Sequence, residues 1–459
     1  MNDSASTPNP APVRGACPGV AAPMATGDGL LLRIRHPIGG LDADQTRAIA
    51  EVARRHGSGA LELTSRGNLQ IRGVTPDRLA AARAALETLG LVDADPEREA
   101  IRNVLVAPLC DIDPAAVDVG PTARALSKAM LEHPTLRALP PKVGVLVDGG
   151  GAAPLEDTAA DLRLEAVHDG SRVVYRLAVG ATAREATLLG RVPEETAVAA
   201  AIEVLERFVA LREHHDPAPR RLAEAVSRAG ASALSPRAAT PDVRTPDPVT
   251  AGAADRPPEP GDHGRWLGVA FPFGALTATQ LEALAAEVTE TAGRVRLTPW
   301  RMLLLTGFDP TAAERLTAAG AILDGDDPRR RLSACIGRPG CQWASTTTRD
   351  DALGLATAIA ALPGSGTVLD VDGCAKACSR SRSAPLLLVA EEGRYHVQVR
   401  ENGELRTLAT GQPPRAARDL VTTLARRILA SKREEENVQE TIDRIGADAL
   451  ATRPEEGCR

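Results

Sequence analysis

Four cysteines are the residues of this chain whose types and spacing point most directly to chemistry. They form two close pairs separated by 32 residues, in a chain that holds only seven cysteines among 459 residues. The four are Cys335, Cys341, Cys374 and Cys378. The short loops within each pair are rich in Gly and Ala, which lets backbone N–H groups approach sulfur as a thiolate-bound cluster requires. Zinc-binding pairs usually have two to four intervening residues. The five residues between Cys335 and Cys341 therefore favour an iron–sulfur cluster, with zinc as the alternative.

The other cysteines and the histidines give weaker signals. Cys17, Cys110 and Cys458 are isolated, so we interpret each as an ordinary core or surface thiol. A mononuclear metal site is often held by two histidines and one carboxylate. The eight histidines show no such spacing. The compact run His214-His215-Asp216 ends a predicted helix, and a solvated helix terminus is the favoured interpretation.

Composition excludes some classes of protein. The net charge is -6, the isoelectric point is about 5.9 and only 2% of residues are aromatic. These values argue against a general nucleic-acid binder or a protein that binds anionic membranes. An anionic ligand would need a local cluster of Arg and Lys. No apolar run approaches the ~18 residues of a membrane span, and no signal peptide is visible, so we expect a cytoplasmic location.

The elements that must position the cysteines follow from hydrophobic periodicity. The patterns predict strands over 29–35, 60–64, 103–107, 142–147, 162–167 and 173–179. They predict helices over 44–56, 76–89 and 194–213, the first with Asp42 or Asp44 as N-cap and Gly57 as its stop. Residues 215–263 hold nine prolines and no aromatic residue, so we interpret most of this segment as linker.

The two sides of this linker share an ordered set of motifs. Leu41-Asp42-Ala43-Asp44-Gln45 matches Leu276-Thr277-Ala278-Thr279-Gln280, about 235 residues later, and Leu63-Thr64 matches Leu297-Thr298. Because the motifs recur in order, each at the start of a βαβ pattern, a tandem duplication is favoured over chance. Two equivalent halves usually pack around a shared site, so Arg66 and Arg301 are expected at related positions facing it.

These motifs resemble those of the siroheme sulfite and nitrite reductase superfamily. Besides the cysteines, the resemblance rests on Thr64-Ser65-Arg66-Gly67-Asn68-Leu69-Gln70, Arg102-Asn103-Val104 and Leu139-Pro140-Pro141-Lys142-Val143-Gly144. In the last motif the superfamily has two lysines; Lys142 keeps the first and Gly144 replaces the second. The resemblance implies an α+β fold of tandem-duplicated ferredoxin-like half-domains plus two nitrite/sulfite reductase-like α+β subdomains.

Within the superfamily, the chain most resembles the precorrin-3B synthase family. The narrower signatures are residues 14–19, 27–31, 297–301 and 372–378. The resemblance implies O2-dependent hydroxylation of precorrin-3A at C20 with closure of a γ-lactone, in aerobic cobalamin biosynthesis. It implies a 4Fe-4S cluster on the four cysteines, a mononuclear non-haem iron and an external reductant such as NADH. The implied partners are precorrin-3A, O2 and an electron donor, without nucleic acid or membrane.

The resemblance also implies a set of substrate-binding residues. They are Arg66, Asn68, Gln70, Arg102, Lys142 and Arg301. A tetrapyrrole with many carboxylates suits clustered cations, and bidentate arginine above all. No catalytic residue and no ligand of the mononuclear iron is assigned.

The expected domain division has seven parts. They are an N-terminal arm (1–25), half-domain 1 (26–95), reductase-like subdomain 1 (96–214), the Pro-rich linker (215–263), half-domain 2 (264–325), the 4Fe-4S-binding subdomain 2 (326–410), and a C-terminal helix and tail (411–459). Two alternative functions remain at this point. One is a siroheme-dependent sulfite or nitrite reductase, against which Gly144 weighs. The other is a non-catalytic iron–sulfur carrier or zinc-stapled module.

Overall fold

The computed structural model describes residues 18–241, 257–289, 291–364, 366–379 and 383–451. The described residues form two compact units, one of 18–24 with 92–241, the other of 25–91 with the residues from 257 onward. Within the described ranges, no helix combines the length and apolar character needed to cross a membrane. Cys17, Cys458 and residues 14–17 of the first family signature lie outside the described residues.

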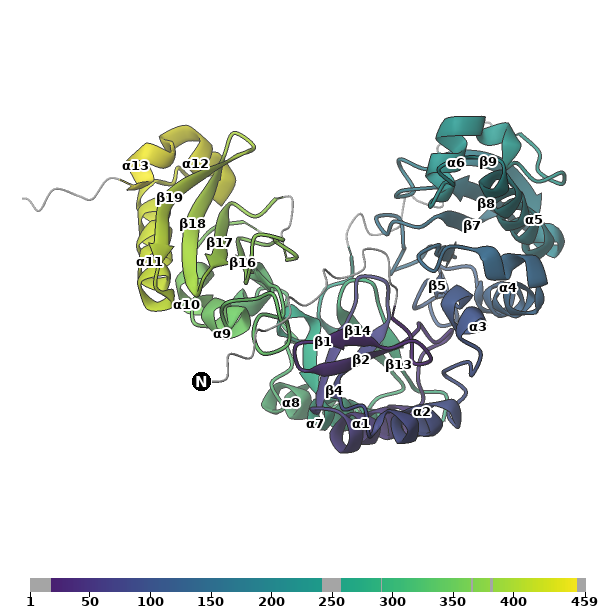
Figure 1. Cartoon of the computed structure of the whole chain (residues 1–459), viewed down its shortest axis with the longest axis horizontal. Helices are drawn as coiled ribbons and strands as arrows, with labels where there is room; N and C mark the ends of the chain where they lie inside the picture. The colour runs from purple at the N-terminus through teal and green to yellow at the C-terminus, as the bar shows by residue number, and fades with distance from the viewer. Residues whose placement is uncertain (1–17, 242–256, 290, 365, 380–382, 452–459) are drawn as a thin grey trace, which may run out of the picture. The chain divides into compact units, whose positions relative to one another are not determined.

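The second unit contains one half-domain twice (Figure 1). The first copy is β1 (Met24–Thr26), β2 (Gly29–Ile34), α1 (Ala43–His56), β3 (Ala60–Leu63), β4 (Leu69–Val74) and α2 (Leu79–Glu87). The second copy is β10 (Gly261–Asp262), β11 (Trp266–Ala270), β12 (Ala275–Thr277), α7 (Ala278–Glu287), β13 (Arg294–Leu297), β14 (Met302–Thr306) and α8 (Ala312–Ala318). Their antiparallel sheets have the orders β1-β2-β4-β3-β12 and β10-β11-β14-β13. The predicted tandem duplication of half-domains is confirmed.

The two half-domains complete each other. The short strand β12, which precedes α7, pairs with β3 of the other copy through Leu276 and Leu61. Leu41, which precedes α1, forms a bridge with Val295 on β13. Helices α1 and α7 pack side by side under these sheets (Figure 1). Because the segment before each helix pairs with the opposite half, the two halves form one body with approximate two-fold symmetry.

The repeated Leu-x-Ala-x-Gln motif is a repeated helix start. The Asp42 side chain accepts from Gln45 N at 2.7 Å, and the Gln45 side chain accepts from Asp42 N at 3.2 Å. Thr277 and Gln280 form the same capping box before α7, at 3.2 and 2.9 Å. Each box satisfies backbone donors that the first helical turn leaves unpaired. Of the two predicted N-cap candidates, Asp42 is the cap and Asp44 lies within the helix.

Duplication extends to the two subdomains. The first sheet, in the first unit, is β5 (Val104–Val106), β6 (Val145–Asp148), β7 (Leu162–Asp169), β8 (Arg172–Val179) and β9 (Thr187–Pro193). The second sheet, in the second unit, is β15 (Leu332–Ala334), β16 (Leu369–Asp372), β17 (Leu386–Glu391), β18 (Arg394–Glu401) and β19 (Glu404–Gln412). In each, the first two pairings are parallel and the last two antiparallel.

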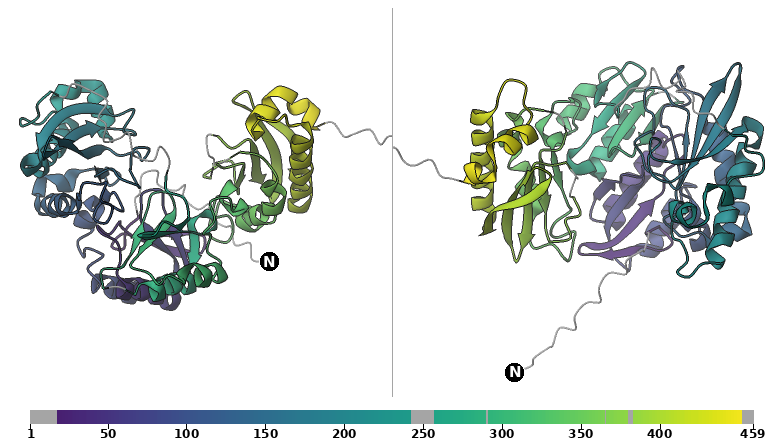
Figure 2. Two further views of the ribbon diagram at one scale, coloured as in Figure 1. Left: turned by 180° about the vertical axis from the view of Figure 1, so that it is seen from behind. Right: turned by 90° about the horizontal axis from the view of Figure 1, so that it is seen from above.

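Helices cover these sheets. In the first subdomain they are α3 (Pro96–Ile101), α4 (Gly120–Glu132), α5 (Glu194–Glu213) and α6 (Leu222–Ala229). In the second they are α9 (Thr348–Leu353), α10 (Ala356–Ala360), α11 (Pro414–Ser431), α12 (Val438–Ile445) and α13 (Ala447–Ala451). Short 3-10 helices lie at Pro134–Ala138, Ala231–Ala233, Pro272–Gly274 and Pro328–Arg331. Figure 2 shows the long helix α11 running along the second sheet, where Leu424 and Ile428 join the core formed with Leu388 and Val397.

Within residues 215–263 the structure differs from the expected organisation. The segment interpreted as linker is folded over 222–229, where α6 buries Leu222 and Ala225. Leu234 is also buried, and Thr240 pairs with Arg191 of β9. The proline count hid this short amphipathic stretch, whose apolar residues pack onto the first subdomain. Residues 242–256 of the expected linker lie outside the described residues.

Candidate functional site

Strand topology places the four cysteines. Cys335 directly follows β15, and Cys374 follows β16 by two residues. Because β15 and β16 are adjacent and parallel, their carboxyl ends meet at one edge of the sheet. The pKa of the Cys378 thiol is raised, first by burial and then by the fields of Cys374, Cys335, Asp372 and Cys341. The other three predicted cysteines therefore lie within electrostatic reach of Cys378.

Backbone donors and small residues shape these loops. Gly373 N donates to Cys335 Sγ at 3.2 Å, and Thr348 Oγ1 lies 3.8 Å from the same sulfur. Burial raises the pKa of Cys335, while the N–H groups of Gly373 and Gly337 oppose that rise. A Cβ on Gly373 would lie 2.6 Å from Ala344 Cβ, so only glycine lets the two loops pack this closely. These N–H groups would stabilise a thiolate at Cys335.

The four thiols and the backbone N–H groups beside them are the candidate donor set for a metal centre. Among the described residues, no three His, Cys, Asp or Glu side chains converge closely enough to bind one metal ion. In a 4Fe-4S cluster each thiolate binds a different iron, so the four sulfur atoms need not converge on one point. Four neighbouring thiols with backbone N–H donors suit the cluster. Its assignment to these cysteines stays a prediction.

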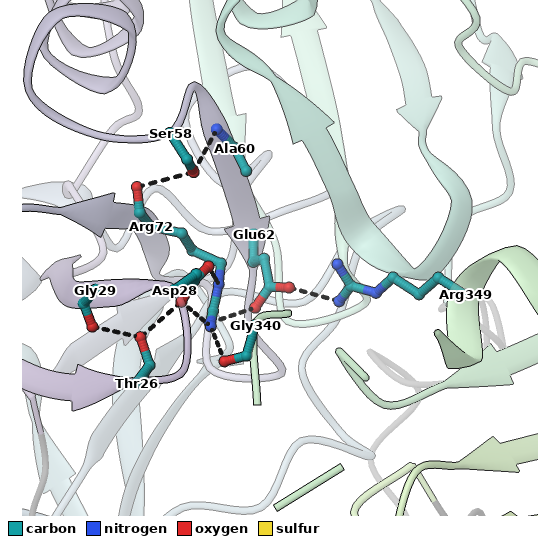
Figure 3. A network of polar contacts seen from close by, with 9 residues as sticks. All are labelled: Thr26, Asp28, Gly29, Ser58, Ala60, Glu62, Arg72, Gly340 and Arg349. Atoms are coloured by element: carbon teal, nitrogen blue, oxygen red, sulfur yellow. Dashed lines mark hydrogen bonds and ion pairs between the residues drawn. The ribbon is translucent and has the colours of Figure 1, made fainter. Parts of the chain in front are cut away.

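A buried network of charges lies against the first cysteine loop (Figure 3). Arg72 of β4 is 4% exposed. Its Nε donates to Asp28 Oδ2 at 3.0 Å, and its Nη2 donates to Asp28 Oδ1 at 2.9 Å and to Gly340 O at 2.8 Å. Its Nη1 lies 3.5 Å from Glu62 Oε2, and Glu62 also accepts from Arg349 at the start of α9. Sequence reasoning missed Arg72, Glu62 and Arg349. The signal in the sequence was a charged residue, Arg72, between Ile71 and Gly73. The structure shows that all six residues of β4 are buried.

Arg301 lies close to this network. It sits in the turn between β13 and β14 with φ of 56°, and Gly274 packs against it so closely that a Cβ there would lie 2.7 Å from Arg301 Cβ. Arg301 is exposed to solvent. Its pKa is nevertheless lowered, because neighbouring protein removes part of its water and Arg349 repels it, while Glu62 acts in the opposite direction. Arg301 and Arg349 thus share the field of Glu62.

Arg66 occupies the turn equivalent to that of Arg301. The turn is tied together by Thr64 Oγ1, which accepts from the backbone N of Arg66 at 3.3 Å and of Asn68 at 3.1 Å. Asn68 Oδ1 accepts from His36 N at 2.9 Å, so Asn68, a predicted substrate-binding residue, also supports the turn. The third, Gln70, is 8% exposed on β4, opposite Glu62 of β3. The structure therefore brings Arg66, Asn68 and Gln70 onto one turn and strand.

His36 has the most perturbed histidine environment. Its pKa is lowered to about 4, mainly by burial and also by Arg296, while Gly67 O opposes the change. The ring Nδ1 lies 3.2 Å from Gly67 O. A neutral imidazole that donates from Nδ1 satisfies this carbonyl and steadies the turn that carries Arg66.

Arg102 and Lys142 belong to the first unit. Arg102 ends α3, where its Nη1 lies 3.5 Å from Oε2 of the buried Glu99. Lys142 is half-buried, and its carbonyl accepts from Arg221 at 2.6 Å. A Cβ on Gly144 would lie 3.3 Å from Asn103 Nδ2, so this glycine packs tightly. That these two cations join Arg66 and Arg301 around one ligand stays a prediction.

The compact histidine run has a local structural role. His214 Nδ1 lies 2.8 Å from Ala210 O, and His215 Nδ1 lies 2.8 Å from Leu211 O. Both rings therefore bond to the last turn of their own helix, as a helix terminus favours.

Comparison with known proteins places this architecture in a family context. The family model for the nitrite/sulfite reductase ferredoxin-like half domain matches residues 22–89 and 257–320. A precorrin-3B synthase from Sinorhizobium sp is 32% identical over 455 residues, which cover 97% of this chain and 95% of that protein. A ferredoxin–nitrite reductase from Synechococcus elongatus is 24% identical, covering 82% of this chain and 78% of that protein.

A solved structure shows the same fold. The Mycobacterium tuberculosis NirA protein aligns with a TM-score of 0.69 over 92% of this chain and 84% of that chain, at 20% identity. At this identity the match supports the fold alone. It agrees with the α+β architecture of duplicated half-domains and duplicated subdomains.

Proposed function

The chain belongs to the precorrin-3B synthase family, and from this premise we propose that it hydroxylates precorrin-3A at C20 with O2 and closes the γ-lactone. The observation that carries the proposal is the 32% identity to a precorrin-3B synthase over 97% of the chain. This match covers more of the chain, at higher identity, than the match to the Synechococcus elongatus nitrite reductase. The proposed enzyme is a monooxygenase of aerobic cobalamin biosynthesis, acting in the cytoplasm.

Substrate recognition is proposed to rest on cations within an acidic protein. Arg66 and Arg301 occupy equivalent turns of the two half-domains. A guanidinium binds a carboxylate through two parallel N–H bonds, which suits a substrate that carries many acetates and propionates. Asn68 and Gln70 support the Arg66 turn and strand. Arg102 and Lys142 are proposed to add two further cations.

The proposed cofactors follow from the family. Cys335, Cys341, Cys374 and Cys378 would hold the 4Fe-4S cluster, which supplies single electrons when bound. The N–H groups of Gly373 and Gly337 would stabilise the thiolate at Cys335. A mononuclear non-haem iron and a reductant such as NADH complete the proposal. The balance is one O2, two electrons and two protons for one water and one oxygen atom added across a double bond at C20. The carboxyl oxygen of the ring-A acetate bonds the adjacent carbon to close the lactone, and its proton stays on the new C20 hydroxyl group.

The most direct test compares turnover of precorrin-3A with and without O2. We expect product only when O2 and a reductant are both present, no siroheme in the visible spectrum, and no turnover of sulfite or nitrite. Hydroxylation at C20 without O2 at the aerobic rate would refute the proposal. Bound siroheme with sulfite turnover would instead support the reductase alternative.

Gly144 offers a second test of the same choice. The superfamily motif has lysine here, and a second cation beside Lys142 suits a small oxyanion more than a bulky precorrin. Gly144→Lys should impair precorrin-3A turnover by crowding the substrate. Because any Cβ presses on Asn103 at 3.3 Å, Gly144→Ala is the matched control for packing. Equal losses in both variants would assign the effect to packing alone.

A further inference from the structure

The peptide group that precedes Cys341 is held from both sides. Its carbonyl, Gly340 O, accepts from Arg72 Nη2 at 2.8 Å and from Gly27 N at 3.2 Å. Its N–H, on Cys341, donates to Gly337 O at 2.8 Å. Because a peptide group is planar, fixing both of its polar atoms fixes the backbone from which the Cys341 side chain projects.

Close packing leaves this loop little room to move. A Cβ on Gly27 would lie 2.5 Å from Pro339 O and 2.8 Å from Gln342 N. A Cβ on Gly340 would lie 2.4 Å from Ile336 Cγ1. The loop 336–342 thus packs closely against Gly27 of the first half-domain, and within the loop Gly340 packs closely against Ile336.

An arginine side chain can donate to Asp28 and to Gly340 O at the same time. Its planar fork gives Asp28 two N–H bonds while the same Nη2 also reaches Gly340 O. Lysine carries its charge at a single point and could not span the same partners. A buried ion network contributes little net stability compared with apolar packing. The use of charged residues here is therefore better explained by the backbone geometry that their hydrogen bonds impose on the loop 336–342.

A second arm reaches the other end of the cysteine loop. Glu62 bridges Arg72 and Arg349 (Figure 3). Arg349 follows Thr348, whose Oγ1 donates to Cys335 O at 2.6 Å and lies 3.8 Å from Cys335 Sγ. One network of the first half-domain thus contacts the loop before Cys341 and the helix that supports Cys335.

We infer that Arg72 is a positioning residue for the cluster, holding the loop 336–342 so that the Cys341 thiolate is presented at a fixed place. This inference rests on the cluster assigned in the proposed function and is independent of the substrate. Arg72 acts through Gly340, and it lies on the strand that follows the Arg66 turn. The half-domain that carries Arg66 thereby also sets the geometry of the cluster loop.

The test uses full-length protein with Arg72→Gln and Arg72→Lys. The matched control is Arg163→Gln, because Arg163 is also buried and donates to Leu155 O, Thr158 O and Glu165, but lies in the first unit. The readouts are iron and sulfide per chain, the electron paramagnetic resonance spectrum of the reduced cluster, its reduction potential, and the rate of iron loss to a chelator.

We expect Arg72→Gln to speed iron loss by roughly tenfold or more and to change the resonance spectrum, as loss of outer-shell support does at other metal sites. Arg72→Lys should rescue only weakly, and Arg163→Gln should lower stability while leaving the spectrum unchanged. If Arg72→Gln does not fold, Gly27→Ala displaces the same loop and should change the same spectrum.

The inference would be overturned if both Arg72 variants had the same spectrum, potential and iron-loss rate as the wild type. Where Gly27→Ala is measured instead, the same result in that variant would overturn it. Equal spectral changes in Arg163→Gln would also overturn it. Wild-type protein without iron and sulfide would instead contradict the proposed cluster itself, so the two failures are distinguishable.

Discussion

Arg301 and Arg349 both lie in the field of one carboxylate, Glu62, which Arg72 also approaches. Three guanidinium groups near one glutamate, with Asp28 bonded to Arg72, leave this part of an acidic protein locally cationic. Arg301 shows the consequence, since its pKa is lowered by lost water and by Arg349. A carboxylate ligand beside Arg301 would relieve that repulsion, which suits a polycarboxylate substrate.

The first residue-scale prediction concerns binding. Arg66→Ala and Arg301→Ala should each weaken precorrin-3A binding by about 2 kcal/mol, the scale of a lost charge-assisted contact. Lysine should rescue poorly wherever the contact is bidentate. Titration calorimetry measures the change, with the exposed Arg54→Ala on α1 as control. Unchanged affinity in both alanine variants would remove these residues from the site.

The cysteines give the second prediction. Cys374→Ser should remove most of the iron, the sulfide and the brown colour, because serine oxygen is a poor ligand for the cluster. Cys110→Ser, a buried thiol of the first unit, should keep all three. Iron and sulfide analysis of both proteins decides the matter. Full cluster content in Cys374→Ser would show that the ligand assignment is wrong.

His36 supplies a pH-dependent prediction. Its pKa is lowered to about 4 in the folded protein, from an ordinary 6.5. Above pH 6.5 both states hold a neutral ring. As the pH falls from 6.5 towards 4, the unfolded chain takes up a proton that the folded protein resists, so stability falls by at most about 3 kcal/mol. Denaturant titrations should show this loss in the wild type and a smaller one in His36→Asn. Identical pH profiles would contradict it.

At the scale of elements, the sequence predicts the helices and strands that depend on interactions between residues close together in the chain. The sequence pattern predicts a helix over 194–213, and α5 (Glu194–Glu213) has the same bounds. The spacing of the four cysteines predicts that they belong together, and the parallel strands β15 and β16 carry Cys335 and Cys374 to one edge of the sheet. The pairing of β12 with β3 was not predictable, since it joins segments more than 200 residues apart. The contact of Arg72 with Gly340 escaped for the same reason.

The helix starts provide an element-scale prediction. Asp42→Ala and Thr277→Ala each remove a capping box, and each should lower the free energy of unfolding by about 1 kcal/mol. Asp44→Ala lies in the first turn of α1 and is exposed, so it should have a smaller effect. Urea titration of the three variants measures the difference. Equal effects of Asp42→Ala and Asp44→Ala would contradict the capping account.

At the scale of the whole molecule, both the half-domains and the subdomains are duplicated, and the copies differ in the residues at equivalent positions. The strands β6 and β16 end in buried Asp148 and Asp372, each followed by glycine. The next residue is Gly150 in the first subdomain and Cys374 in the second. Of the two equivalent sheets, only the second has this pattern of cysteines after its strands. One copy is therefore proposed to hold the cluster, while the other contributes Arg102 and Lys142.

Above all, we propose that this chain inserts one atom of O2 into precorrin-3A. The most direct measurement is mass spectrometry of the product formed under 18O2 in unlabelled water, with reductant present. We expect one 18O atom per product molecule, located in the new C20 hydroxyl group. A product whose C20 hydroxyl oxygen comes from water, or one formed equally fast without O2, would contradict it.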